Sequence, residues 1–482
     1  MAGGAIGPGV IVDLSRMSSI GEVDTGERSV WVDAGALRGD VNRAAAANDL
    51  RFPVDPSSGE FCTIGGMVAA NAAGAHTMRF GATRDWVLAL DCVFDDGSRA
   101  TVERGKPLPA DIPAIARFES EVRDDLATAD PLSALHDGVL KESSGYGIAA
   151  YARSGELIDL LVGSEGTLAV IAGVKLALTE VPPATGGILA AFDSLDNAVA
   201  AAVAAREAGA VACELLDRTF LDLAASGDAT LHVPALASVP AGTEAVLLAE
   251  VEGSSAEEAM IRANDLSSSF LKAGATVATV AVEAADQKEI WELRHAASPI
   301  LSRLDPSLKS MQFVEDGAVP PANLGDYVRG VRAALDARGA RGVIFGHAGD
   351  AHIHVNPLID VSAPDWRERV EGLLEDIVTL TARLGGTLAG EHGDGRLRAP
   401  LLDRVWDRGA TELFARVKKA FDPRGILNPG VKVPLPKQRA LMDIKYDPAL
   451  APLPRAAREA LDKVSETRGY STLRLSLLPG KS

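Results

Sequence analysis

Residues 346–356 read Gly-His-Ala-Gly-Asp-Ala-His-Ile-His-Val-Asn, and residues 390–395 read Gly-Glu-His-Gly-Asp-Gly. These two short segments hold four of the chain's eight histidines. A lone histidine in a turn-rich region is most often a hydrogen-bonded core residue, and that is the alternative interpretation. Four histidines framed by glycines and acidic residues indicate a functional site instead. We therefore expect the chain to fold around these four side chains: His347, His352, His354 and His392.

The first segment has the pattern of two strands joined by a tight turn. Residues 343–345 form a short apolar run, and residues 352–358 alternate with the period of two that is typical of a strand. The glycines and aspartate between them suit a turn. Strand alternation places His352, His354 and Asn356 on one face. The turn returns His347 toward His354, so we expect two imidazoles to converge from neighbouring strands.

The second segment adds a carboxylate to this pair of imidazoles. Residues 366–384 have the apolar period of a helix, and Glu391 and His392 follow in a loop framed by glycines. Two histidines and one glutamate with an open position are the ligand set of a catalytic divalent metal, and the lack of a nearby cysteine disfavours a structural zinc site. His352 shares a face with His354, and is either a further ligand or a hydrogen-bonding neighbour of one.

Length and composition limit the functional classes. The chain has 482 residues, enough for two or three domains, and its net charge of −18 argues against a general role in binding nucleic acid or anionic membranes. Three widely spaced cysteines, Cys62, Cys92 and Cys213, indicate a reducing compartment and no CxxC-type metal site. Neither a signal peptide nor a transmembrane span is visible. These features predict a cytoplasmic protein, with peripheral contact to the inner face of the membrane as the variant.

The first part of the chain reads as strands, helices and small-residue loops. Residues 62–76 are so rich in small side chains that the backbone must approach something closely, and its amides suit a phosphate; tight turns are the alternative. Residues 160–171 predict a strand, a glycine–hydroxyl turn and a second strand, either as a plain hairpin or as donors to a bound cofactor. The other elements expected here are strands at 10–14, 29–34, 87–94 and 98–102 and helices at 37–48 and within 104–140.

The composition shifts near Glu180-Val-Pro-Pro, where we place a domain boundary. Beyond it, strands alternate with long amphipathic helices, which predicts an α+β unit with a mostly antiparallel sheet. Residues 433–482 are rich in Pro, Lys and Arg and predict a loosely held extension with one helix at 456–464. The elements expected between 185 and 340 are strands at 187–192, 245–251 and 276–282 and helices at 195–208, 256–273 and 323–337.

Several motifs, taken together and in order, carry a resemblance to a known family. They are Asp55-Pro-Ser-Ser, Thr63-Ile-Gly-Gly-Met-Val-Ala, Gly163-Ser-Glu-Gly-Thr-Leu, Gly346-His-Ala-Gly-Asp with His354, Gly390-Glu-His-Gly-Asp-Gly and Asp422-Pro-Arg-Gly-Ile-Leu-Asn-Pro-Gly. Each glycine loop alone is a weak signal, but their joint order is specific. Over residues 1 to about 432 the chain resembles the FAD-dependent D-2-hydroxyacid dehydrogenases of the vanillyl-alcohol-oxidase type, which include D-lactate dehydrogenase, the glycolate oxidase flavin subunit and D-2-hydroxyglutarate dehydrogenase.

This resemblance implies an α+β fold in three parts. Residues 1–178 correspond to a PCMH-type FAD-binding domain, residues 179–432 to an FAD-linked oxidase C-terminal domain for substrate and metal, and residues 433–482 to an extension. Family members carry a further strand and a Gly-Gly-Gly-Thr-Ser loop ahead of the point where Met1 stands, so we expect the FAD-binding domain to be incomplete at its N-terminus. The family more often has Asn where His352 stands, which is expected to alter metal coordination or substrate fit.

The resemblance also implies roles for particular residues. His347, His354 and Glu391 match the metal ligands, and His392 and Asn356 match positions that contact the substrate, with His392 as the general base. Arg294 and Lys309 match positions that bind the substrate carboxylate; the alternative is a solvated helix charge and a surface lysine. The expected FAD-binding residues are Pro56, Ser57, Ser58, Thr63, Ile64, Gly65, Gly66, Ala69, Asn71, Gly74, Gly163, Glu165, Gly166, Thr167 and Asn428.

The implied reaction is oxidation of a D-2-hydroxy acid to the 2-oxo acid with hydride transfer to FAD. The divalent metal is expected to be zinc, with manganese and iron as alternatives. No nicotinamide fingerprint is present, so the expected electron acceptor is a quinone, a cytochrome or an electron-transfer protein rather than NAD. A homodimer is the expected assembly if the chain associates. Two other hypotheses stay open: a flavin-free metallohydrolase that uses the same His/His/Glu set, and a non-catalytic flavoprotein subunit.

Overall fold

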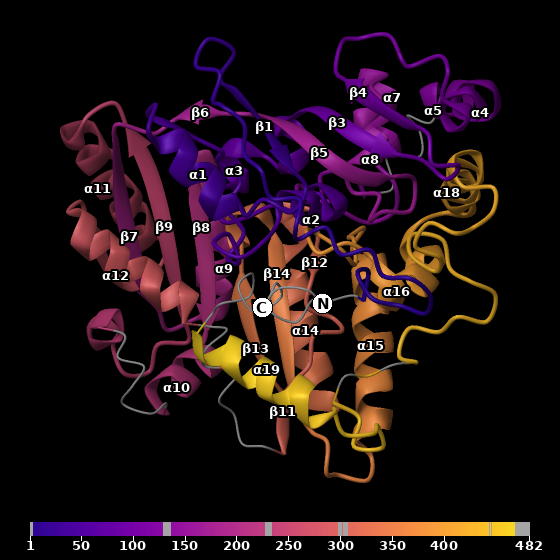
Figure 1. Cartoon of the computed structure of the whole chain (residues 1–482). Helices are drawn as coiled ribbons and strands as arrows, with labels where there is room; N and C mark the ends of the chain where they lie inside the picture. The colour runs from indigo at the N-terminus through magenta and orange to yellow at the C-terminus, as the bar shows by residue number, and fades with distance from the viewer. Residues whose placement is uncertain are drawn as a thin grey trace.

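The chain folds into two units, each built on an antiparallel sheet (Figure 1). The computed structural model describes residues 3–128, 136–226, 234–296, 301, 307–442, 444 and 446–467. One sheet has four strands in the order β1-β5-β3-β4, and a second has eight, in the order β10-β7-β9-β8-β13-β14-β11 with β12 pairing to β14. Strands β2 and β6 form a separate two-stranded sheet. This mixed architecture confirms the predicted α+β class.

The first unit contains the four-stranded sheet and short helices around it. A hairpin joins β3 and β4, the strands predicted at 87–94 and 98–102, and Gly97 takes the left-handed conformation that its turn needs. Its elements are β1 (Ser29–Asp33), α1 (Arg38–Ala46), β2 (Leu50–Arg51), α2 (Ile64–Ala70), α3 (Thr77–Phe80), β3 (Val87–Val93), β4 (Arg99–Glu103), α4 (Pro113–Glu121), α5 (Arg123–Ala127), α7 (Ile148–Ser154), α8 (Ile158–Leu161), β5 (Val170–Ala177) and β6 (Thr179–Glu180).

Three expectations for this unit are wrong. Residues 10–14 form no strand and are largely exposed, because the edge of β1 that they would need is occupied by bridges from Ile20 and Asp24. The expected strand from residue 160 is the end of helix α8, since a short apolar run buried on all sides does not distinguish helix from strand. Instead of one helix within 104–140 there are two, α4 and α5, separated at Val122; residues 129–135 lie outside the described part.

The second unit contains the eight-stranded sheet and most of the long helices. The predicted strands and helices from 187 to 337 and the helix from 366 are confirmed, while β8, α10, α12, β11 and β12 are additional. Its elements are β7 (Ala184–Phe192), α9 (Leu195–Glu207), β8 (Ala212–Asp217), α10 (Arg218–Ser226), β9 (Ala245–Gly253), α11 (Ala256–Lys272), β10 (Ala275–Ala281), α12 (Ala284–His295), β11 (Leu308–Ser310), β12 (Gly317–Ala318), α14 (Leu324–Ala337), β13 (Arg341–Gly346), β14 (His352–Asp360) and α15 (Trp366–Arg383).

Helices cover both faces of the eight-stranded sheet, which explains why its central strands are apolar on both sides. Along β7, Ile188 and Ala190 pack into the main core with α9, α11, α14 and α15, whereas Leu189 and Ala191 pack into a second cluster with α10 and α12. The same division holds on β14, where Ile353 and Val355 belong to the main core. The predicted split of β14 between apolar and polar faces is therefore confirmed.

After α15 the chain returns to the first unit. Helix α18 (Arg408–Phe421) packs against α4 at the right of Figure 1, with the rings of Phe118 and Phe421 5.4 Å apart. Two short helices, α16 (Gly395–Arg398) and α17 (Leu402–Val405), lead into it. The predicted helix in the extension is confirmed as α19 (Arg455–Thr467), and residues 468–482 lie outside the described part.

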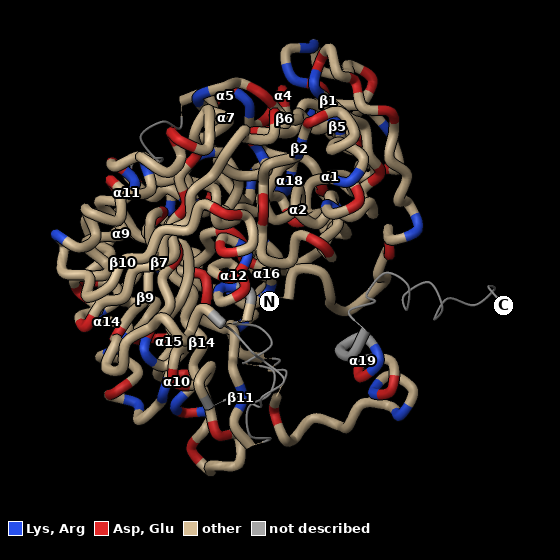
Figure 2. The backbone as a smooth tube through the Cα atoms, turned by 90° about the vertical axis from the view of Figure 1, so that its left-hand side faces the viewer, with Lys and Arg blue, Asp and Glu red and all other residues tan. Residues whose placement is uncertain are grey.

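Charged residues occupy both the surface and the interior. In Figure 2 acidic and basic residues alternate around the periphery, and a further group of both signs gathers at the centre near α12 and α16. Within the described residues, every helix is too short or too polar to cross a membrane.

One histidine fastens the two units together. His76 follows the small-residue loop of the first unit, and its Nδ1 lies 2.6 Å from Asp55 while its Nε2 lies 2.9 Å from Glu250 on β9. Burial lowers the pKa of His76, but the charges and hydrogen bonds of Asp55 and Glu250 outweigh it and raise the pKa well above the ordinary histidine value. The protonated form therefore bridges two carboxylates from different units.

This bridge predicts a pH-dependent contribution to stability. Because the folded-state pKa is raised, the contribution is complete below the unfolded pKa of about 6.5 and is lost as the pH rises through the folded value. We expect His76→Asn to cost about 2 kcal/mol of unfolding free energy at pH 6, the scale of charged hydrogen bonds, and progressively less at alkaline pH. Urea unfolding of both proteins across this range measures the difference. A gap that widens with pH would contradict the bridge.

Candidate active site

Two imidazoles and one carboxylate meet at the centre of the molecule. His347 follows β13, His354 lies on β14, and Glu391 lies in the loop after α15. Glu391 Oε1 is 3.4 Å from Nε2 of His347 and 3.3 Å from Nε2 of His354. All three side chains are at least 90% buried. The structure therefore brings together the three residues that the sequence predicts as metal ligands, and their nitrogen and oxygen donors suit a divalent metal such as zinc.

Strand pairing and a tight turn produce this convergence. In the β13–β14 ladder, Phe345 lies opposite His354, which leaves His347 two residues further on at the start of the turn. Gly346 has φ of 137°, and a Cβ there would come within 3.0 Å of the His352 carbonyl oxygen, so only glycine fits. The turn closes with Ala351 in the left-handed region.

Each of the two histidines predicted as metal ligands has its ring fixed by a partner on Nδ1. His347 Nδ1 lies 2.5 Å from the Glu214 carboxylate, and His354 Nδ1 lies 2.8 Å from the backbone carbonyl of Glu315. A donor hydrogen on Nδ1 leaves the Nε2 lone pair of each ring free to face Glu391. This arrangement of imidazoles held from behind is typical of metal-binding histidines.

Glu391 is also held from outside the cluster. The ammonium of Lys141, which is completely buried, lies 3.4 Å from Glu391 Oε2 and 2.8 Å from the carbonyl oxygen of Gly74. Burial raises the pKa of Glu391, but Lys141 and His347 outweigh it and hold the pKa well below the ordinary value. Glu391 is therefore an anion, and Lys141 connects it to the first unit.

His392 lies at the edge of the cluster among carboxylates. Its Nδ1 is 3.2 Å from Glu315 Oε1, and its Nε2 is 3.4 Å from Glu391 Oε1. Burial opposes its charged form, but the carboxylates, Asp316 foremost, outweigh burial and hold its pKa well above the ordinary histidine value. With 19% of its side chain exposed, compared with 5% for His347, it is more accessible to a proton donor or acceptor than the predicted ligands.

His352 joins the cluster but differs from its neighbours. Its Nε2 lies 2.9 Å from Asp316 Oδ1, and burial lowers its pKa to about 3, so that the ring is neutral. Its Nδ1 has no hydrogen-bond partner among the described residues. The ligand atoms of His347, His352, His354 and Glu391 all lie within 4.8 Å of one another, so His352 fits a fourth ligand as well as a neighbour of Asp316.

The three remaining predicted catalytic residues differ in position. Asn356 is buried on the same face of β14 as His354, and its Oδ1 lacks a partner among the described residues. Arg294, on α12, is buried with its Nε 2.6 Å from Glu214 Oε2, which links it to His347. Lys309 lies apart: it pairs with Ile359, five residues along β14 from His354, and its ammonium faces the ring of Tyr446. Its role as a carboxylate-binding group stays a prediction.

The two predicted cofactor loops lie against each other. The amide of Gly163 donates to the carbonyl of Val68, and the amide of Glu165 donates to the carbonyl of Ala69, so the Gly163–Thr167 loop runs along α2. The hydroxyl of Thr63 caps the N-terminus of α2. The predicted cofactor-binding residues that lie in α2 and in the Gly163–Thr167 loop, or cap α2, are Thr63, Ile64, Gly65, Gly66, Ala69, Asn71, Gly163, Glu165, Gly166 and Thr167.

Other predicted cofactor residues lie at the edges of this assembly. Asn428 donates to the carbonyl oxygens of Glu165 and Gly4 at 2.7 and 2.8 Å. Gly74 packs so closely on the backbone of Asp55 that a Cβ would come within 2.4 Å. Pro56, Ser57 and Ser58 follow Asp55, and both serines are exposed.

The loop chemistry fits a flavin nucleotide. Ser164, in the second loop, is 1% exposed and its hydroxyl has no partner among the described residues. Gly166 has a positive φ and open space on the side where a Cβ would stand. A buried donor without a partner, close to a glycine with open space beside it, suits a ligand that approaches the backbone.

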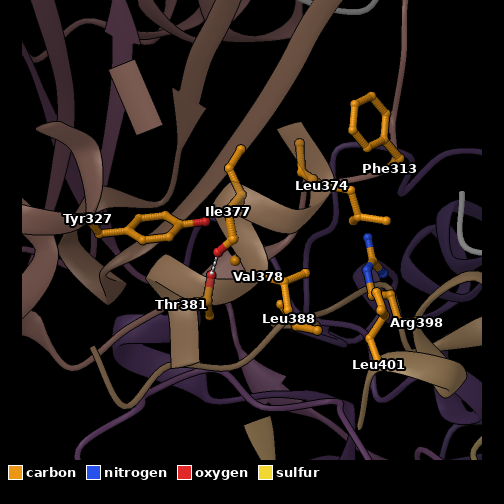
Figure 3. A pocket seen from close by; sticks show the side chains of 11 residues that line it. Phe313, Tyr327, Leu374, Ile377, Val378, Thr381, Leu388, Arg398 and Leu401 are labelled. Carbon is orange, nitrogen blue, oxygen red and sulfur yellow. Dashed lines mark hydrogen bonds between the residues drawn. The ribbon is translucent and has the colours of Figure 1, made fainter. Parts of the chain in front are cut away.

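A neighbouring apolar pocket is separate from this site. It lies between α14, α15 and the residues after α16, and Figure 3 shows Tyr327, Leu374, Ile377 and Leu388 lining it together with Arg398. Arg398 links the pocket to the cluster, because its guanidinium lies 2.5 Å from Glu315 Oε2. The lining offers few polar groups for a carboxylate substrate, so this pocket is not a candidate for the chemistry.

Sequence reasoning missed the residues that surround the predicted set. Glu214, Lys141, Glu315 and Asp316 are all buried and contact the ligands or His392. Their partners are distant in sequence, 133 residues away for Glu214 and 250 for Lys141. One sequence feature could have indicated Glu214: it is a charged residue inside the apolar strand Ala212–Asp217. A buried acid requires a partner, so such a residue predicts a buried ion pair.

Solved structures with the same fold include an oxidase and a synthase. A 4-ethylphenol oxidase from Gulosibacter chungangensis matches 88% of this chain and 80% of its own, with a TM-score of 0.62 and 13% identity. An alkyldihydroxyacetonephosphate synthase matches 86% of this chain and 67% of its own, with a TM-score of 0.56 and 16% identity. At these identities the likeness defines the fold.

Family models and curated relatives identify the family. Residues 181–431 match the C-terminal domain of FAD linked oxidases, and residues 1–103 match an FAD binding domain. The chain belongs to the FAD linked oxidase family.

Three curated relatives are similar to most of the chain. It is 31% identical to D-2-hydroxyglutarate dehydrogenase of Escherichia coli (strain K12) over 89% of its length, which spans only 44% of that relative. It is 30% identical to glycolate oxidase subunit GlcD of the same strain over 90% of its length and 77% of the relative. It is 28% identical to D-lactate dehydrogenase of Archaeoglobus fulgidus over 89% of its own length and 83% of the relative.

The geometry of the cluster predicts the effect of removing its carboxylate. Glu391→Ala takes away the atom that faces both imidazoles, so we expect metal binding to weaken by more than the roughly 10–100-fold that losing an outer partner costs. Elemental analysis and zinc or manganese titration of the purified protein measure this. Glu375→Ala, which removes an exposed glutamate paired with Arg404, is the control. Equal metal content in both variants would remove Glu391 from the ligand set.

Proposed function

We propose that this protein is a flavin-dependent oxidoreductase that oxidises a D-2-hydroxy acid to the 2-oxo acid, using FAD and a divalent metal. The observation that carries the proposal is the convergence of His347, His354 and Glu391 next to the glycine loops of an FAD binding domain. Lys141 spans the two, from Gly74 to Glu391. The names of the curated relatives support the substrate class, and the FAD binding match disfavours a flavin-free hydrolase.

FAD and the divalent cation each contribute one kind of chemistry. FAD, held by the loops at 56–74 and 163–167 and by Asn428, supplies the hydride acceptor when it is bound. A divalent cation, held by His347, His354 and Glu391, supplies Lewis-acid polarisation of the substrate oxygens when it is bound. The protein must do the rest: bind the acid, orient it and remove the hydroxyl proton.

His392 is the group that removes this proton once its ring is neutral, a form that the positive charge of a divalent cation at the neighbouring ligands would favour over the protonated ring that the carboxylates stabilise. Its ring lies 5.3 Å from that of His354, beside the proposed metal position, and it is the more exposed of the two. The carboxylates of Glu315 and Asp316 stabilise the imidazolium that His392 becomes after accepting the proton. Such a positioned base contributes about 10²–10⁴-fold to the rate.

Arg294 and Asn356 bind the substrate. The guanidinium of Arg294 neutralises the substrate carboxylate and is itself held by Glu214. The Oδ1 of Asn356 lacks a partner among the described residues. The Asn356 amide forms a hydrogen bond with the acid, in which either its Oδ1 accepts or its Nδ2 donates. Lys309 is retained as a second carboxylate-binding group. A quinone, a cytochrome or an electron-transfer protein would take up the electrons of the oxidation.

The proposed function is tested by flavin bleaching. The purified chain is reconstituted with FAD and zinc or manganese, and its absorbance is recorded anaerobically before and after adding D-lactate, glycolate or D-2-hydroxyglutarate. We expect loss of the oxidised flavin band with at least one acid and none with the L-enantiomers of the chiral acids. Flavin that binds but stays oxidised with a wider panel of D-2-hydroxy acids would overturn the substrate class. Metal bound without flavin would overturn the cofactor assignment.

The role of His392 leads to a separate prediction. His392→Ala removes the proton acceptor but none of the predicted flavin contacts, so we expect bleaching to slow by about 10²–10⁴-fold while the flavin content is unchanged. Stopped-flow absorbance measures the rate, and the thermal midpoint serves as the folding control. Wild-type bleaching in this variant would show that another group removes the proton.

A further inference from the structure

A buried glutamate connects the proposed metal position to the proposed substrate-binding arginine. Glu214 lies on β8, next to the strand that leads into His347, with Leu215 of β8 opposite Gly346 of β13. Its side chain is fully buried. Oε1 lies 2.5 Å from Nδ1 of His347, and Oε2 lies 2.6 Å from Nε of Arg294. Each carboxylate oxygen therefore holds a different functional side chain.

This arrangement fixes the orientation of His347. Because the Nδ1 hydrogen is donated to Glu214, the Nε2 lone pair points to the opposite side of the ring, where Glu391 Oε1 lies 3.4 Å away. His354 receives only a neutral backbone carbonyl on its Nδ1. A carboxylate behind the ring also raises the basicity of the nitrogen that faces the metal. Of the two imidazoles, His347 therefore depends more on its outer partner.

The same carboxylate fixes Arg294. Arginine has several rotatable bonds, and holding its Nε at 2.6 Å restricts the direction of the guanidinium. The guanidinium carbon also lies 5.0 Å from the centre of the Phe345 ring, two residues before His347. Helix α12 is in this way anchored to the strands that carry the proposed metal ligands.

We infer that Glu214 is a positioning residue whose single carboxylate sets both the metal affinity and the binding of the substrate carboxylate. The inference rests on the proposed function and goes beyond it, because it makes two binding events depend on one side chain that contacts neither ligand. The alternative is a purely structural ion pair, whose loss would lower stability and leave metal affinity unchanged.

The neighbouring strand supplies a matched control. Glu250 on β9 is also mostly buried and also accepts hydrogen bonds from a histidine and a second ring, at 2.9 Å from His76 Nε2 and 3.0 Å from Trp291 Nε1. It lies outside the group of possible ligands. Glu250→Gln removes the same charge by the same atom change as Glu214→Gln, without touching His347 or Arg294.

The first experiment measures metal affinity without flavin turnover. Zinc or manganese is titrated into the metal-stripped full chain, wild type and both variants. We expect the dissociation constant to rise about 10–100-fold in Glu214→Gln and to stay within about twofold of wild type in Glu250→Gln. Equal constants in the two variants would overturn the inference. If the wild type binds no cation, the proposed metal site itself fails, and the inference fails with it.

A second variant keeps the test valid if Glu214→Gln does not fold. Glu214→Asp retains the charge but draws the oxygens back by one methylene, so positioning is lost while the net charge is kept. We expect weaker metal binding and a raised KM for the acid that bleaches the flavin, with kcat less affected, because ground-state binding is what suffers. Wild-type metal affinity and KM in Glu214→Asp would show that Glu214 acts only as a buried charge.

Discussion

The structure depends on the pairing of buried charges that come from separate elements of the chain. Removing one partner of such a pair leaves an uncompensated charge in a low-dielectric interior, which costs about 3–5 kcal/mol. Glu214 is held by Arg294 and His347, Glu391 by Lys141, and Lys432 by Asp394. None of these groups can be satisfied within its own element, so the elements must meet in one arrangement.

One consequence is that the proposed flavin loops and the proposed metal loop form a continuous hydrogen-bonded assembly. Glu165, in the second cofactor loop, accepts from the amides of Asp394 and Gly395 at the end of the segment that carries Glu391. Lys432 binds Glu165 and Asp394 together. A hydride transfer requires donor and acceptor to be held at a short and fixed distance, and loops that share buried ion pairs provide that rigidity.

The sequence predicted the parts of this assembly that are local. Period-two alternation placed His354 and Asn356 on one face of β14, and the glycine turn returned His347 to them. The glycine-framed loop and the family resemblance predict Glu391 as a metal ligand, and the structure places its carboxylate against both imidazoles.

The other residues of the site could not be predicted from local sequence patterns. Glu214 and Lys141 act on residues more than a hundred positions away, and a single charged residue in an apolar strand does not say which partner it will meet. The N-terminal strand expected at residues 10–14 failed for a related reason. A strand is stable only if an edge is available, and bridges from Ile20 and Asp24 already occupy that edge of β1.

The pattern of satisfied and unsatisfied groups separates the two sides of the site. The proposed ligands His347 and His354 each have an outer partner, so their orientation is determined before any ligand arrives. Asn356, two residues from His354 on the same face, leaves its Oδ1 without a partner among the described residues. A buried polar atom left unpaired costs about 1–3 kcal/mol, and this cost is recovered when a ligand supplies the missing hydrogen bond. The proposed cation side is therefore preorganised, and the side that faces Asn356 would gain its last hydrogen bond from the proposed substrate.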